Sequence, residues 1–308
     1  MIDITLLGTS ALMPLPNRAL TSAFLSCEGH SILFDCGEGT QTAARKAGIS
    51  LMKTDIFAIT HYHGDHIFGL PGLLQTMTSM SRTDKLYITG PEGLNDSLEP
   101  ILKLAGGLSF ETELIEIPDE GIMLAELIHG WPHESKLSAF MTEHRIISQG
   151  YCFELGRAGK FMPERAKELN IPVNLWSILQ KGQSVVVNEN MIMPEQVLGE
   201  RRKGLKFIFT GDTAECDNLT DAARDADLMI CDATYGENEQ SELAKAHGHM
   251  NFSQAAETAK KAGVKQLWLS HYSPMIDDPL QYLPDALNIF ADTLCGHDGM
   301  KITLKFEN

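Results

Sequence analysis

The chain has 308 residues, of which 43% are hydrophobic and 21% charged, a balance that indicates a globular protein and makes disorder a poor description. No run of about 18 uninterrupted apolar residues occurs, and no basic segment precedes the apolar stretch in MIDITLLGTS, so neither a membrane span nor a signal peptide is predicted. The formal net charge of -16 argues against indiscriminate adhesion to nucleic acid and gives no help to a polyanionic substrate.

The N-terminal half alternates short apolar segments with turns. MIDITLLG predicts a first strand that stops at Gly8, and AFLSCEGHSILFDCGEGT predicts a hairpin about EGH whose second strand ends at Asp35. QTAARKAG has the composition of a helix that ends at Gly48. DIFAIT is the next predicted strand, and a cluster of histidines follows its C-terminal end.

The C-terminal half repeats this pattern. LKFIFTGDT, ADLMICDATYGE and VKQLWLSHYSP predict strands that end at Asp212, Asp232 and His271. Between the last two, FSQAAETAKKAG predicts an amphipathic helix that ends at Gly263. With DIFAIT, four strands therefore deliver Asp or His at their tips, which is how a sheet builds a site along one edge.

Residues 156–204 differ from both halves. This stretch predicts a short helix over about Pro163 to Leu169, several turns and little strand periodicity. We interpret it as an insertion that projects from the core. Its basic residues, partly balanced by glutamates, are Arg157, Lys160, Arg165, Lys167, Lys181, Arg201, Arg202 and Lys203.

The six cysteines are scattered and form no CxxC pair. A chain of this size does not need disulfides for stability, so reduced thiols, most of them small core residues, are expected. With no targeting segment predicted, we expect a cytoplasmic location.

The segment THYHGDHIFGLPGLL, which begins at Thr60, concentrates metal-binding side chains. His61 and His63 alternate with Tyr62 and so point to one side of an extended segment, whereas Asp65 and His66 follow as the chain turns. Two ligands can then face one metal ion and two the next. A His and Asp set without thiolates is more often hydrolytic than structural. The alternative is a run of surface histidines without a ligand.

This segment resembles the signature of the metallo-β-lactamase fold, and GDHIFGLPGLL is similar to the motif of the ribonuclease Z family of tRNA 3′-processing endonucleases. The resemblance spans nearly the whole chain. It implies a single α/β (α+β) domain over residues 1–308, built as an αββα sandwich of two mixed β-sheets with helices on the outer faces. It also implies a homodimer, with residues 156–204 as an arm that contacts tRNA.

The family pattern supplies the remaining metal ligands. EHRIISQGY resembles the segment that contributes His144, FTGDT is similar to the strand end that contributes a bridging Asp212, and LSHYS matches the final ligand, His271. His129 and His133 are rivals of His144, but neither has the Gly-Tyr spacing, and we expect them in loops. The implied sets are His61, His63, His144 and Asp212 for one zinc ion and Asp65, His66, Asp212 and His271 for the other.

The resemblance also implies the catalytic residues. GHMNFSQAA is similar to the family segment that makes His249 the proton donor to the departing oxygen, and Asp65 would accept the proton of water. CDATYGE stands where the family has His-Glu-Ala-Thr, so Asp232 replaces the glutamate that orients that histidine and Cys231 replaces a histidine. Because Asp is one methylene shorter, we expect a looser relay, or a His249 held in another way.

Substrate-binding residues are expected at two places. ERAKELNIPVNLWSILQKGQ resembles the arm that clamps the tRNA elbow, although VN stands where the family usually has Gly-Pro, and Arg165, Lys167 and Lys181 are the candidates there. Near the strand tips the candidates are Arg18, in PLPNRALTS, and Thr213. For Arg18, the alternative hypothesis of a surface loop that does not contact substrate has equal weight.

The function that the resemblance implies is hydrolysis of a phosphodiester in precursor tRNA, leaving 3′-OH on the tRNA and 5′-phosphate on the trailer. Two Zn²⁺ ions are the expected cofactors, with Mn²⁺ or another divalent ion as the alternative. One rival is a hydrolase of the same fold for a small phosphodiester, a thioester or a lactam. Others are a catalytically silent RNA-binding or scaffold protein, and a di-iron protein, which His63 disfavours because iron would suit a carboxylate there.

Overall fold

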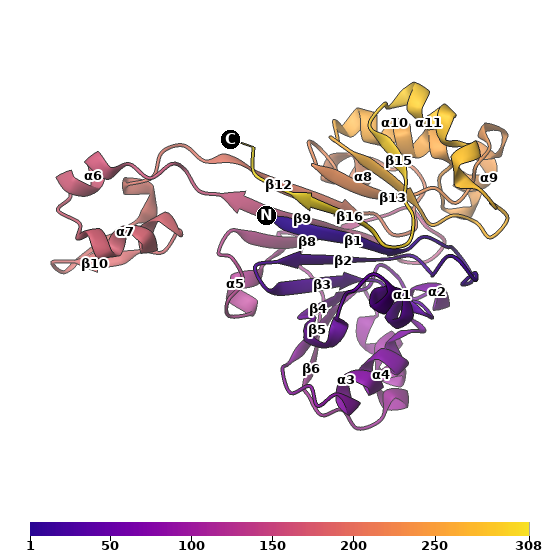
Figure 1. Ribbon diagram of the computed structural model, residues 1–308, viewed down its shortest axis with the longest axis horizontal. Coiled ribbons are helices and arrows are strands. Elements are labelled where there is room, and N and C mark those ends of the chain that lie inside the picture. The colour runs from indigo at the N-terminus through magenta and orange to yellow at the C-terminus, as the bar shows by residue number, and fades with distance from the viewer. Residues whose placement is uncertain (308) are drawn as a thin grey trace.

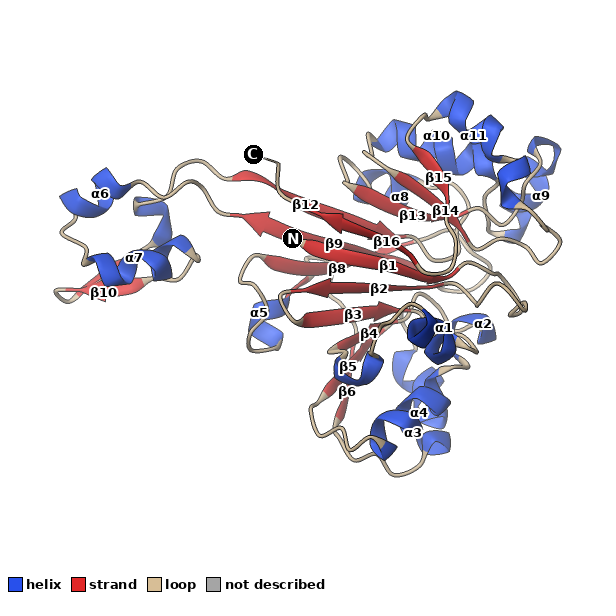
Figure 2. Ribbon diagram, in the orientation of Figure 1, coloured by secondary structure: helices blue, strands red, loops and turns tan. Residues whose placement is uncertain are grey.

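In the computed structural model, which describes residues 1–307, two seven-stranded sheets pack face to face with helices on their outer faces (Figures 1 and 2). The first sheet, in the order β16-β1-β2-β3-β4-β5-β6, contains β1 (Ile2–Gly8), β2 (Ser22–Cys27), β3 (His30–Phe34), β4 (Ile56–Ala58), β5 (Leu86–Thr89), β6 (Thr112–Ile115) and β16 (Met300–Leu304). The second, in the order β15-β14-β13-β12-β9-β8-β7, contains β7 (Ile122–Met123), β8 (Ser135–Met141), β9 (Gln149–Arg157), β12 (Arg202–Phe209), β13 (Leu228–Asp232), β14 (Leu267–Ser270) and β15 (Thr293–Cys295). Both sheets mix parallel and antiparallel pairs, which confirms the predicted αββα sandwich.

The helices are α1 (Thr40–Lys46), α2 (Gly64–Ile67), α3 (Leu70–Ser79), α4 (Leu94–Ala105), α5 (Leu124–Leu127), α6 (Pro163–Glu168), α7 (Val173–Gln180), α8 (Asp217–Ala222), α9 (Ser241–His247), α10 (Phe252–Ala262) and α11 (Leu283–Ile289). Short 3₁₀ turns lie at Leu51–Lys53, Pro194–Gln196, Asn238–Gln240 and Pro279–Gln281. Among residues 1–307, no helix combines the length and apolar character needed to cross a bilayer.

Successive side chains of a strand point to opposite faces of its sheet, so the hydrophobic core is divided into three layers. In β3, Ile32 and Phe34 point into the core between the sheets, whereas Leu33 points into the core under α1, α3 and α4. A third core, under α8, α10 and α11, contains Phe252 and Ala259. All six cysteines are free thiols, as expected, and four of them are buried.

The predicted helix before Gly263 is confirmed as α10. Asn251 caps it, since its side chain accepts a hydrogen bond from the Gln254 amide at 2.8 Å while the Gln254 side chain accepts one from the Asn251 amide at 3.0 Å. Gly263 then ends the helix with a left-handed φ of 69°, which glycine adopts without strain. This packed helix supports β13 and β14, whose ends carry Asp232 and His271.

The segment between β9 and β12 extends away from the sandwich (Figure 1). It has a small core of its own, which includes Ala166, Leu179 and Val187. The prediction of little strand periodicity missed one short hairpin, formed by β10 (Val185–Val187) and β11 (Asn190–Ile192). Both residues of its tight turn, Asn188 and Glu189, have positive φ.

Candidate metal centre

The structure brings together all seven side chains expected to bind metal. They come from the segment after β4 that includes α2, from the β8–β9 connection and from the ends of β12 and β14, which meet at one edge of the sandwich. The seven are His61, His63, Asp65, His66, His144, Asp212 and His271. Gly211, with a φ of 61°, lies against the Thr60 side chain, where a Cβ would clash at 2.6 Å, so a glycine lets Asp212 approach the histidines.

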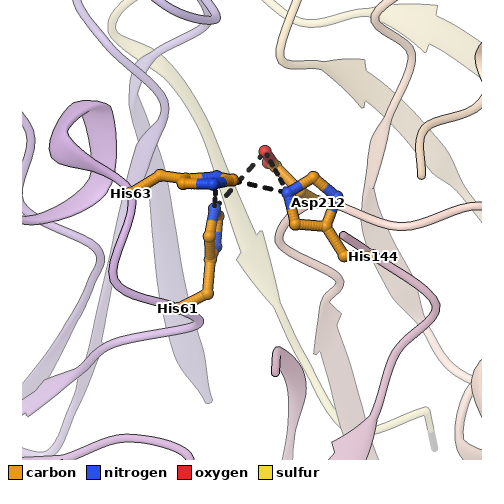
Figure 3. A group of neighbouring side chains, drawn as sticks. All are labelled: His61, His63, His144 and Asp212. Carbon is orange, nitrogen blue, oxygen red and sulfur yellow. Dashed lines mark hydrogen bonds and ion pairs between the residues drawn. The ribbon is translucent and has the colours of Figure 1, made fainter. Parts of the chain in front are cut away.

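One cluster consists of His61, His63, His144 and Asp212, whose side chains point toward one another (Figure 3). His61 Nε2 lies 2.9 Å from His63 Nδ1, and His144 Nε2 lies 3.2 Å from the same nitrogen. Asp212 Oδ2 is 3.6 Å from His61 Nε2 and 3.9 Å from His144 Nε2.

The second cluster shares Asp212 with the first. Asp212 Oδ1 lies 3.1 Å from His271 Nε2 and 3.3 Å from His66 Nε2, and Asp65 Oδ2 is 3.8 Å from each of these nitrogens. The two imidazole nitrogens and Asp212 Oδ1 are buried and lack a hydrogen-bond partner. Buried polar atoms rarely remain without a partner, so the space between these three atoms is suited to a cation.

A divalent ion fits both clusters. A zinc ion held at about 2.0 to 2.1 Å by tetrahedral ligands separates its donor atoms by about 3.4 Å, which lies inside the range of 2.9 to 3.9 Å found between donor atoms in the two clusters. The donor set of imidazoles and carboxylates without thiolates suits Zn²⁺ and neighbouring divalent metals. The residues present are therefore able to hold divalent metal.

Asp35, which follows β3, orients two of these histidines. It is fully buried, and its Oδ2 accepts hydrogen bonds from His66 Nδ1 at 2.7 Å and from the Thr60 hydroxyl at 2.9 Å. Thr60 Oγ1 lies 3.0 Å from His61 Nδ1. Both imidazoles thus hold their protons on Nδ1 and turn Nε2 toward the centre.

Asp232 and Thr234, at the end of β13, orient two further histidines, His249 and His271. Asp232 Oδ1 accepts a hydrogen bond from the Thr234 hydroxyl at 2.7 Å, and that hydroxyl lies 2.9 Å from His271 Nδ1. Asp232 Oδ2 lies 2.7 Å from His249 Nδ1 and accepts the Thr213 amide at 3.0 Å. Because both of its oxygens already accept hydrogen bonds, Asp232 is better suited to positioning than to ligation.

The direct contact between Asp232 and His249 corrects the expectation of a looser relay. Burial lowers the pKa of His249, but the Asp232 carboxylate outweighs this effect and raises that pKa to about 9. Cys231, in place of the family's histidine, is buried in the core under α10. The aspartate therefore reaches His249 directly despite its shorter side chain.

Two residues of the site have strained backbones. Asp35 has a φ of 54° and His271 a φ of 61°, a left-handed region that is uncommon for residues other than glycine, although Asn, Asp and His enter it more often than most. Such strain persists only where surrounding contacts impose it, and it is typical of functional sites. Here it turns both side chains inward from their strand ends.

The imidazoles of the first cluster are neutral. Burial lowers the pKa of His61, His63 and His144, so each keeps a lone pair. Burial also disfavours a charged His66, but Asp212 and Asp35 outweigh it and raise the pKa of His66 well above its usual range. A bound cation would take the place of that proton.

A cavity of about 710 Å³ opens above the centre. Sequence reasoning missed three polar residues on its wall, Arg145, Tyr235 and His247, although each lies within three positions of a predicted site residue. Arg145 is exposed, and the Tyr235 hydroxyl lies 2.5 Å from His247 Nδ1. These groups can contact the part of a substrate that lies next to the reacting bond.

The other expected positions divide into three groups. Thr213 is fully buried, and its hydroxyl donates to the Ala214 carbonyl at 2.6 Å, so the prediction that it contacts substrate is wrong. Arg18 is half-buried and donates to the Ile276 carbonyl at 2.6 Å, so its contact with substrate stays a prediction. His129 and His133 lie in loops, as expected, and line a separate cavity at the base of the arm.

The basic residues predicted on the arm are exposed. Arg165 and Lys167 lie on α6 on either side of the buried Ala166, and Lys181 follows α7. Within residues 1–307, Arg165, Lys167 and Lys181 form no ion pair, whereas Arg201 pairs with Glu134 at 3.5 Å. The arm and the metal centre lie at opposite ends of β12, an eight-residue strand that spans about 26 Å.

Family models match both halves of the chain. Residues 2–157 match the model described as anti-Pycsar protein Apyc1, and residues 183–272 match the beta-lactamase superfamily domain. Among solved structures, the short form of human tRNase Z is 26% identical, with a TM-score of 0.68, and the match covers 99% of this chain and 100% of that one. The metallo-beta-lactamase fold protein YhfI of Bacillus subtilis has a TM-score of 0.66 at 19% identity and covers 98% of both chains, which supports the fold alone.

Curated relatives match over the full length. Proteins named ribonuclease Z from Lachnoclostridium phytofermentans and Agathobacter rectalis are each 42% identical, over 100% of this chain and 99% of theirs. One from Clostridioides difficile is 39% identical over 100% of both. Identity at this level along the whole chain, with the metal-type side chains gathered at one edge of the sandwich, shows that the chain belongs to the ribonuclease Z family.

Proposed function

We propose that this protein is a metal-dependent endonuclease that removes the 3′ trailer from precursor tRNA, leaving 3′-OH on the tRNA and 5′-phosphate on the trailer. The observation that carries the proposal is His249, held by Asp232 at 2.7 Å beside two clusters of metal-type donors. Membership in the ribonuclease Z family supports the substrate class.

Two divalent ions, which we propose to be Zn²⁺, would ionise a water molecule and polarise the scissile phosphate when bound. His61, His63, His144 and Asp212 would hold one ion, and Asp65, His66, Asp212 and His271 the other. Asp65 would accept the proton of the attacking water. His249, protonated beside Asp232, would donate a proton to the departing 3′-oxygen.

The separation of the arm from the metal centre favours a macromolecular substrate. A molecule that touches both must extend over about 26 Å, the length of β12. Arg165, Lys167 and Lys181 would contact backbone phosphates, and Arg145 a phosphate near the cleaved bond. Because the chain carries a net charge of -16, these local cations would have to supply the attraction, and binding should weaken with salt.

We further propose a cytoplasmic homodimer in which residues 156–204 form the tRNA-binding arm of a single metallo-β-lactamase domain. The six free thiols fit a reducing compartment. Sedimentation of the purified protein tests the dimer.

One assay separates this function from hydrolysis of a small phosphodiester, thioester or lactam. The metal-loaded protein is incubated with end-labelled precursor tRNA and, in parallel, with bis(p-nitrophenyl) phosphate, each with and without chelator. Cleavage of the precursor at one position, with the stated ends and sensitivity to chelator, is expected. Turnover of the small substrate with an intact precursor would refute the tRNA function.

A further inference from the structure

Three large apolar side chains on the cavity wall are exposed. Leu12, Met13 and Phe68 are 76%, 49% and 70% exposed, and all three line the cavity above the metal centre. We call these residues the apolar wall. The polar groups Arg145, Tyr235 and His249 line the same cavity, and we call them the polar wall. Exposed apolar side chains gathered at a polar site usually mark a surface that receives a ligand.

The ring of Phe68 is held in place by the metal-binding loop. A Cβ at Gly64 would lie 2.4 Å from a ring carbon of Phe68, so the ring packs directly against the glycine backbone. Phe68 caps α2, the helix that carries Asp65 and His66. The ring therefore lies against the segment that carries these two side chains, while most of its surface remains accessible.

The rest of the apolar wall is also tied to the centre. The Leu12 amide donates a hydrogen bond to Asp65 Oδ2 at 2.8 Å, and Leu12 adopts a left-handed φ of 65°. This hydrogen bond places Leu12, and Met13 after it, beside the carboxylate of Asp65, three residues before Phe68. Figure 1 shows α2 and α9 on opposite sides of the strand ends, and His249 follows α9.

We infer that the apolar wall binds an unpaired nucleobase adjacent to the scissile phosphate, with Phe68 as its stacking platform. This inference rests on the proposed nuclease function and adds a substrate subsite to it. An aromatic face stacks on any base, so the subsite would position the strand without reading its sequence. The polar wall would meanwhile contact the phosphate and the leaving oxygen.

The test is a double-mutant cycle on precursor tRNA. Wild type, Phe68→Ala, Phe68→Leu and Phe68→Trp are assayed with precursors that carry either a normal or an abasic nucleotide immediately before or after the cleaved bond. Phe68→Ala and Phe68→Leu should lower kcat/KM about 5- to 100-fold on the normal precursor, and Phe68→Trp should retain the activity. With the abasic nucleotide at one of the two positions, wild type and Phe68→Ala should turn over equally.

Leu104→Ala is the matched control, because Leu104 is 73% exposed on α4 and does not line the cavity. Its kcat/KM and the metal content of all variants should equal those of wild type. The subsite is refuted if Phe68→Ala cuts the normal precursor like wild type, or loses the same factor on every abasic precursor. A shift from dimer to monomer with that uniform loss would make the apolar wall a protein interface. Failure of wild type to cut any precursor would instead refute the nuclease function.

Discussion

Asp232 accepts a hydrogen bond from His249 at 2.7 Å, although it is one methylene shorter than the glutamate that the family pattern leads one to expect. The remaining acceptor capacity of Asp232 is taken by Thr213 and Thr234. The carboxylate thus links a proton donor, through Thr234, to the metal-facing His271.

Replacement of His249 by alanine should slow cleavage of precursor tRNA about 10²- to 10⁴-fold, the usual contribution of a general acid. Bound metal, measured by elemental analysis, should stay at the wild-type level, because we propose that His249, which lies within reach of Asp212 and His271, donates a proton and is not a metal ligand. His63→Ala should lose metal as well as activity, since His63 Nδ1 lies within the first cluster. A His249→Ala enzyme with full turnover would contradict the proposed role.

Asp232→Asn should move the basic limb of the pH profile of kcat to lower pH. His249 donates only while protonated, so activity falls as pH rises through its pKa, which the carboxylate raises to about 9. Asparagine can still accept the Nδ1 hydrogen bond but removes the negative charge, and the pKa of His249 then falls. Bound cations act on both enzymes alike, so the difference between the two profiles is the measurement. Superimposable basic limbs would show that Asp232 does not set the proton affinity.

The candidate metal ligands could be predicted from sequence because they occupy short local motifs at strand ends. The residues that hydrogen-bond to these ligands could not be predicted in this way. His61, His63, Asp65 and His66 lie within six residues, and their spacing alone suggests a metal. Asp35 reaches His66 across 31 positions, and Thr234 reaches His271 across 37, so only the packed sheets reveal these pairs.

Two errors have related physical causes. Thr213 was expected at the substrate because it ends a strand beside Asp212, but the sequence does not say which way a side chain points at a turn, and Thr213 points inward. In the arm, VVV and NMI are too short for their periodicity to distinguish a strand from a loop. Positive φ at Asn188 and Glu189, which closes the hairpin, became visible only in the structure.

Asp35→Asn should weaken metal binding about 10- to 100-fold, as loss of a group that orients ligands usually does. Asparagine tolerates the left-handed backbone at this position, so the change tests the hydrogen bonds to His66 and Thr60. Asp55→Asn is the matched control, because Asp55 accepts from His30 Nδ1 at 3.1 Å away from the centre. Competition with a metal-sensitive chelator gives the affinities. Equal affinity of Asp35→Asn and wild type would remove Asp35 from the centre.

Paired charge reversal on α6, Arg165→Glu with Lys167→Glu, should raise KM for precursor tRNA and leave hydrolysis of bis(p-nitrophenyl) phosphate unchanged. Each lost phosphate contact should also reduce the slope of log KM against log salt concentration by about 1, because fewer counterions are released on binding. Lys103→Glu is the control, since Lys103 is exposed on α4 and pairs with Glu99 at 2.7 Å. The arm lies a strand length from the reacting bond, so kcat at saturation should hardly change. A wild-type KM that does not respond to salt, or an equal effect of Lys103→Glu, would show that the arm does not bind the tRNA backbone.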